Sequence, residues 1–232
     1  ILQEEDDAKI IAILEWDGAL VDPNGLDVND VFQYKCDNKG GGKGYPRAEY
    51  VEDSKSLLEM ECDILIPAAM EAVINRGNAA KIKAKLIGEA ANGPVTFAAE
   101  TVLKEKGVVI IPDVYLNAGG VTVSYFEWIK NLSHIRFGRM NRRYEEGQSQ
   151  LLIEAIEKTG NKVPVELVEK LSQGADEIAL VRSGLDDTMR KAFQDIRERF
   201  WSNEKIPNYR TAAMAIAIEK IHTSYRTMGI YP

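Results

Sequence analysis

Acidic and amide side chains follow short apolar runs in the first half of the chain. Glu15 follows the run at residues 10–14, and Asn92 comes shortly after the run at residues 84–87. In open α/β sheets the ligand lies across the carboxyl ends of the strands, directly after such runs. Carboxylate and amide groups can hydrogen-bond the hydroxyl groups of a ribose. The spacing therefore predicts a nucleotide-binding edge.

Each of these positions also has a simpler explanation. Glu15 can accept hydrogen bonds from an adenosine ribose and repel a 2′-phosphate, which favours NAD over NADP, or it can merely solvate a strand end. Ala68 and Ala69 follow the run at residues 62–66 and are small enough for a flat ligand to approach the backbone. Asn92 can bind a ribose or a carboxamide, or belong to a plain turn before a helix that starts at Pro94.

A fourth apolar run, at residues 108–111, is followed by an amide, two glycines and two hydroxyl groups. Asn117 and Ser124 are the polar members of this segment with the clearest binding chemistry. The segment leads from a predicted strand into a predicted helix, so its side chains would lie at the edge of the sheet. None of these residues decides the function when it is taken alone.

The elements that would position these residues alternate between strand and helix. Short apolar runs are typical of strands buried on both faces of a parallel sheet, and they are expected at residues 9–15, 62–66, 84–87 and 108–111. Helical patterns separate them, at residues 27–38, around Leu57, and at residues 70–82 and 94–106. The alternation predicts an α/β fold with a Rossmann-like doubly wound parallel sheet.

After Pro112 the pattern becomes helical. Helices are expected at residues 118–137, 147–159, 164–173, 186–201 and 209–228. The polar, charge-rich stretch at residues 138–174 is expected to leave the main body as an excursion. We therefore predict an incomplete dinucleotide-binding domain at residues 1–137, an insertion at residues 138–174, and long C-terminal helices at residues 175–232.

Composition excludes several classes of function. The 29 basic and 36 acidic residues give a net charge of −7, which disfavours binding to nucleic acid or to acidic lipid surfaces. No apolar run is long enough to predict a membrane span. The two cysteines, Cys36 and Cys62, lack the spacing of a metal or redox site, and a reducing compartment is expected.

Several motifs taken together resemble the Glu/Leu/Phe/Val dehydrogenase family, and glutamate dehydrogenase in particular. The similarity rests on Asn92-Gly93-Pro94, on Pro112-Asp113, and on the string from Leu116 to Trp128, LNAGGVTVSYFEW. It extends over residues 9–232 and includes Ser183-Gly184-Leu185 and Arg210-Thr211-Ala212-Ala213. The resemblance implies cofactor contacts at Glu15, Ala68, Ala69, Asn92 and Asn117, and a contact from Ser124 to the α-carboxylate of the substrate.

The family implies a function for the complete enzyme. That function is oxidative deamination of L-glutamate to 2-oxoglutarate and ammonia with NAD, with NADP as the alternative cofactor. By the same resemblance, residues 138–174 correspond to an antenna that makes trimer contacts in a homo-hexamer. Members with an antenna are commonly mitochondrial, so the mitochondrial matrix is expected, with the cytoplasm as the alternative.

The sequence also departs from the family pattern. Trp16 stands where a small residue is usual, and Arg182, Gln194 and Glu198 replace residues of animal nucleotide-regulation sites. No Gly-x-Gly-x-x-Gly loop precedes Glu15, and neither a general base nor a substrate lysine is matched. We therefore expect the chain to be a fragment with no catalytic residue of its own. The alternative is a non-catalytic structural or interaction subunit derived from the family.

Overall fold

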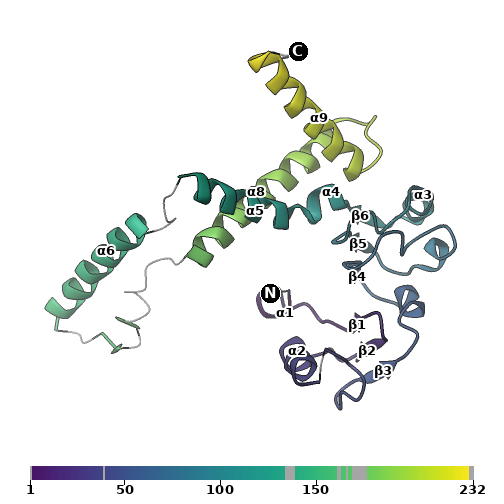
Figure 1. Cartoon of the computed structure of the whole chain (residues 1–232), viewed down its shortest axis with the longest axis horizontal. Coiled ribbons are helices and arrows are strands. Elements are labelled where there is room, and N and C mark those ends of the chain that lie inside the picture. The colour runs from purple at the N-terminus through teal and green to yellow at the C-terminus, as the bar shows by residue number, and fades with distance from the viewer. Residues whose placement is uncertain are drawn as a thin grey trace. The chain divides into compact units, whose positions relative to one another are not determined.

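The structure of the chain is a computed structural model that describes residues 2–38, 40–133, 139–160, 163–165, 167–168 and 177–229. The chain divides into two compact units, Ile1–Ile111 and Pro112–Pro232. Figure 1 shows the order of the elements, which are described unit by unit. The domain boundaries expected at residues 137 and 174 stay a prediction.

The first unit begins with a small antiparallel sheet. Strands β1 (Ala12–Leu14), β2 (Ala19–Val21) and β3 (Glu49–Val51) pair in that order, with Leu14 opposite Ala19. The expected placement of residues 9–15 in a buried parallel sheet is therefore wrong for the described structure. A tight turn is the reason, because the N–H of Glu15 donates to the carbonyl of Gly18 at 2.8 Å and the chain reverses at once.

A helix and a loop cover this sheet. Helix α2 (Val28–Asp37) is capped by Asp27, whose carboxylate accepts a hydrogen bond from the N–H of Asp30, so the helix expected at residues 27–38 is confirmed. A short helix α1 (Leu2–Glu5) precedes the sheet. The core beneath them consists of Leu20, Leu26, Val31 and Tyr45.

The second sheet of this unit is parallel. Strands β4 (Ile64–Leu65), β5 (Leu86–Gly88) and β6 (Val109–Ile111) pair in that order, which confirms the three strands expected from the later apolar runs. Helix α3 (Phe97–Glu105) connects β5 to β6, and short 3₁₀ turns lie at η1 (Ser56–Glu59) and η2 (Ala79–Lys81).

Two helix predictions in this region are corrected. Residues 70–82 contain only the 3₁₀ turn η2, because asparagine side chains bind the backbone in place of a helical ladder. The side chain of Asn75 accepts from the N–H of Gly77, and that of Asn78 accepts from the N–H of Asn75. Helix α3 starts after Thr96, its N-cap, so Pro94 is not at its first position.

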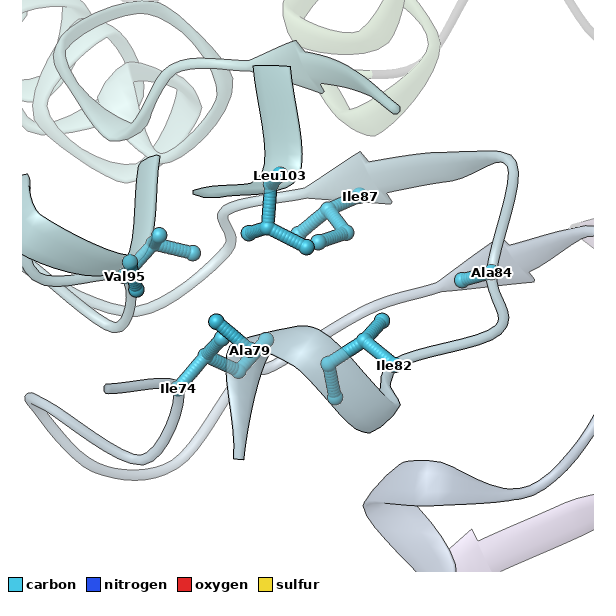
Figure 2. Packing of buried hydrophobic residues seen from close by; sticks show 8 residues of the cluster. Ile74, Ala79, Ile82, Ala84, Ile87, Val95 and Leu103 are labelled. Carbon is cyan, nitrogen blue, oxygen red and sulfur yellow. The ribbon is translucent and has the colours of Figure 1, made fainter. Parts of the chain in front are cut away.

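Close packing of aliphatic side chains stabilises the parallel sheet. Ile87 from β5 and Leu103 from α3 meet Ile74 and Ile82 in one cluster whose side chains are fully buried (Figure 2). Burying a Leu or Ile side chain contributes roughly 1.5–3 kcal/mol. This cluster therefore fixes the strand ends that carry the predicted binding residues.

The second unit is helical. It comprises α4 (Asp113–Leu116), α5 (Ala118–Ser133), α6 (Arg139–Lys158), α8 (Glu177–Ser202) and α9 (Tyr209–Met228). Helix α8 packs against α9 and α5, and a core of Ile196, Ala212 and Ala213 joins α8 to α9. None of the helices in the described ranges is both long and apolar enough to cross a membrane.

The helix predictions that fall on described residues of this unit are confirmed, some of them with different limits. The helix expected at residues 209–228 is confirmed as α9, whereas α6 begins at Arg139 and α8 at Glu177, both earlier than expected. The helix expected at residues 164–173 lies largely outside the described residues. The antenna at residues 138–174 is described mainly through α6, and its excursion from the body stays a prediction.

Candidate functional site

The loops that follow β4 and β5 are joined by backbone hydrogen bonds at the carboxyl edge of the parallel sheet. The carbonyl of Pro67 accepts from the N–H groups of Ala90 and Ala91, at 3.1 and 2.9 Å. The N–H of Glu89 donates to the carbonyl of Ile111 at 3.1 Å, which ties the end of β5 to the end of β6. The three strand ends therefore form one continuous edge.

This edge brings three of the predicted cofactor residues together. Ala68 and Ala69 are exposed directly after the buried Pro67, and Asn92 is exposed in the adjoining loop. Gly93 has a φ of 53°, a left-handed conformation that favours glycine and lets the chain turn after Asn92. Small exposed residues beside an exposed amide leave room for a flat, polar ligand. The predicted cofactor residues Ala68, Ala69 and Asn92 therefore lie along one edge of the parallel sheet.

A buried carboxyl group lies at the same edge and was not assigned a role from the sequence. Glu89 directly follows β5, and its side chain is fully buried. A buried carboxyl group is costly unless it is compensated, so such groups are enriched at functional sites. The signal in the sequence was an acidic residue directly after an apolar run, the same signal that singled out Glu15.

Glu15 lies in the other sheet of the first unit. It is exposed after β1, and its carboxylate forms an ion pair with the ammonium group of Lys35 on α2. Trp16 beside it is 92% exposed. The structure therefore pairs Glu15, the predicted ribose-binding residue, with Lys35, a cation that the sequence pattern did not reveal.

Asn117 and Ser124 belong to the second unit. Asn117 is half-buried and forms the C-cap of α4, where its N–H donates to the carbonyl of Asp113 at 3.1 Å. Ser124 is exposed on α5, and its hydroxyl group donates to the carbonyl of Gly120 at 3.0 Å. To donate to a substrate carboxylate, this hydroxyl group must turn away from the helix backbone.

Two contacts fix α4 within the helical unit. The guanidinium group of Arg210 donates from Nη1 to Oδ1 of Asp113 at 2.6 Å, and the hydroxyl group of Tyr115 donates to the carbonyl of Met189 at 3.0 Å. Burial raises the pKa of Tyr115, which keeps that hydroxyl group protonated as a donor. Sequence reasoning missed the Arg210 contact because 97 positions separate the two residues.

Within the ranges that the structure describes, no group of His, Cys, Asp and Glu side chains has the arrangement of a metal site. At the predicted positions, the first unit offers small residues, an amide and a carboxylate, and the second unit offers an amide and a hydroxyl group. Each of these polar groups can hydrogen-bond a polar organic ligand.

Comparison with known proteins gives one family. The model described as Glutamate/Leucine/Phenylalanine/Valine dehydrogenase matches residues 1–229. The mitochondrial glutamate dehydrogenase of Dictyostelium discoideum is 51% identical over 227 residues, which cover 97% of this chain and 45% of the relative. A probable glutamate dehydrogenase of Sinorhizobium fredii is 42% identical over 221 residues, which cover 95% of this chain and 50% of the relative. The chain spans about half the length of these curated relatives.

Solved structures agree with this result. Glutamate dehydrogenase from Peptoniphilus asaccharolyticus superimposes with a TM-score of 0.61 and 27% identity, covering 98% of this chain and 43% of that one. A hetero-hexameric glutamate dehydrogenase from Thermus thermophilus gives a TM-score of 0.67 at 21% identity, covering 97% of this chain and 42% of that one. The second likeness establishes a shared fold.

Proposed function

Because the chain belongs to the Glutamate/Leucine/Phenylalanine/Valine dehydrogenase family, we propose that it is the cofactor-binding part of a glutamate dehydrogenase. The complete enzyme would convert L-glutamate to 2-oxoglutarate and ammonia. The observation that carries this proposal is the 51% identity to a glutamate dehydrogenase over 97% of the chain.

In the first unit, the proposed cofactor contacts lie at the strand ends. Ala68, Ala69 and Asn92 would receive one face of the dinucleotide, since they are exposed at one continuous edge. Asn117, which follows α4, would hydrogen-bond the cofactor through its side-chain amide. When bound, NAD supplies the acceptor for the hydride that leaves the substrate.

Glu15 would bind the adenosine ribose, and Ser124 would bind the α-carboxylate of glutamate. The exposure of Glu15 after β1 supports the first role. For the second, the hydroxyl group of Ser124 can exchange its bond to the Gly120 carbonyl for a bond to the substrate. NAD is the proposed cofactor, and the pairing of Glu15 with Lys35 keeps NADP as the alternative.

The setting of the enzyme is proposed from its relatives. The mitochondrial Dictyostelium relative supports the mitochondrial matrix as the compartment. The hetero-hexameric Thermus enzyme, which shares the fold, supports an assembly of six subunits, in which residues 138–174 would make trimer contacts. These residues include the long helix α6, which suits helix-to-helix packing between subunits.

Two measurements on the protein from its native source test the proposal. The intact mass is expected to correspond to a chain about twice this length, because the match covers 45–50% of the relatives. The same preparation should form NADH when L-glutamate is added. A native species of this length without glutamate-dependent NADH formation would favour the non-catalytic subunit instead.

A further inference from the structure

We propose that Arg210 is a positioning residue for Asn117, so that the ion pair between Arg210 and Asp113 fixes the backbone that carries Asn117 at the end of α4. This inference rests on the proposed function for the role of Asn117 and goes beyond it in assigning Arg210 and Asp113. The contacts that support it all lie within the second unit.

Two consecutive contacts lead from Arg210 to Asn117. The side chain of Asp113 accepts the guanidinium bond at 2.6 Å, and the backbone carbonyl of the same residue accepts the N–H of Asn117 at 3.1 Å. Both atoms belong to one residue at the start of α4. A displacement of Asp113 must therefore displace the backbone of Asn117.

The Arg210–Asp113 pair is well suited to hold a fixed geometry. Its two side chains are 27% and 21% exposed, so water screens it less than a surface pair. The N–H of Val114 also donates to Oδ1 of Asp113 at 2.8 Å, which orients the carboxylate toward the helix backbone. Hydrogen bonds between charged groups are roughly twice as strong as neutral ones.

A four-residue helix depends on such contacts. Helix α4 is too short to be stable from its own hydrogen bonds, since isolated helices shorter than about 12 residues are marginal in water. Its other anchor is Tyr115, which bonds Met189 and stacks near Phe193 with ring centroids 5.6 Å apart. Tyr115 also packs against the cluster of Ile196, Ala212 and Ala213, and Arg210 adds an ionic contact from the start of α9.

The test uses the side-chain amide resonance of Asn117 in the isotope-labelled 232-residue chain. We expect Arg210→Gln to shift this resonance in the ligand-free protein and Arg210→Lys to restore it in part. The matched control is Arg199→Gln, which breaks the ion pair between Arg199 on α8 and Glu219 on α9 without touching α4. Control spectra should keep the Asn117 resonance unchanged.

Titration with NAD at millimolar concentration completes the experiment. The wild-type chain should show an NAD-induced shift at Asn117, and Arg210→Gln should weaken the apparent affinity about tenfold. An Asn117 resonance that ignores Arg210→Gln, or moves equally in the Arg199→Gln control, overturns the positioning role. If neither the wild-type chain nor the variants respond to NAD, the proposed cofactor role of Asn117 fails, while the ligand-free spectra still decide the positioning role.

Should Arg210→Gln unfold the protein, Asp113→Asn breaks the same ion pair. The Asn117 resonance of that variant is then compared with the same wild-type and control spectra.

Discussion

The pairing of Glu15 with Lys35 determines how the predicted adenosine site would treat a 2′-phosphate. Glu15 alone would repel the phosphate, whereas the ammonium group of Lys35 would attract it. The pattern of apolar runs predicted Glu15 but not Lys35, because a lysine 20 positions away on a helix gives no signal at the strand end. If Glu15 binds the ribose as proposed, both charges would act on the 2′-phosphate of NADP.

We expect opposite changes when the two residues are replaced separately in the complete enzyme. Glu15→Ser should shift the ratio of kcat/KM values toward NADP, because Lys35 is then free to bind the phosphate. Lys35→Met should shift the ratio toward NAD. Each change should be about tenfold, since a charge-assisted hydrogen bond contributes about 1.5–3 kcal/mol and this pair is partly exposed. Lys43→Met, which removes an exposed lysine paired with Glu52, is the control. Unchanged ratios in both variants would remove Glu15 from the ribose site.

Tyr45 provides a pH-dependent contribution to stability. Its side chain is buried, and burial together with the hydrogen bond to Asp30 raises its pKa to about 12. A raised pKa means that the folded state favours the neutral phenol. The contribution is therefore complete below the unfolded pKa of about 10 and is lost as the pH rises toward about 12. Between these two pH values, the free energy of unfolding measured in urea should fall more steeply for the wild-type chain than for Tyr45→Phe. Parallel pH curves for the two proteins would refute this assignment.

At the scale of elements, the sequence predicted well the three strands that form the parallel sheet. The runs around Ile64, Ile87 and Ile110 became the parallel sheet because each is short, apolar and followed by a turn. The first run failed as a parallel strand because Asp17-Gly18, a strong hairpin signal, follows it and forces an antiparallel return. The carboxyl edge was thus predictable for Ala68, Ala69 and Asn92, while the surroundings of Glu15 were not.

The hairpin between β1 and β2 depends on glycine at position 18. Gly18 has a φ of 153°, and an added Cβ would collide with the ring of Tyr50. We expect Gly18→Ala to lower the free energy of unfolding by about 1–3 kcal/mol. Gly41→Ala is the control, because its added Cβ would make only ordinary contacts, the nearest at 3.7 Å. Equal urea midpoints for the two variants would contradict the strain.

At the scale of the whole chain, the described parallel sheet presents an apolar edge. Strand β4 pairs with β5 on one side only, and Ile64 on it is 55% exposed. Edge strands of this kind promote association between chains. We expect the 232-residue chain to associate at increasing concentration, and Ile64→Lys to reduce the association seen by light scattering. Phe97→Lys, which replaces an 87% exposed residue on a helix, should have less effect. An equal effect would indicate general stickiness in place of strand pairing.

The 232-residue chain by itself is expected to bind NAD weakly and not to turn over glutamate. The 232 residues include the small residues and the amide of the proposed cofactor edge. They do not include a Gly-x-Gly-x-x-Gly loop before Glu15 that could bind the pyrophosphate. Each charge-assisted hydrogen bond from a backbone amide to phosphate is worth about 1.5–3 kcal/mol, so the loss of two weakens binding by roughly two to four decades. Calorimetric titration of NAD into the purified chain should therefore give a dissociation constant near the millimolar range. A glutamate-dependent absorbance assay on the same sample should give no NADH. Micromolar binding or measurable turnover would show that other residues of this chain build the pyrophosphate and substrate sites.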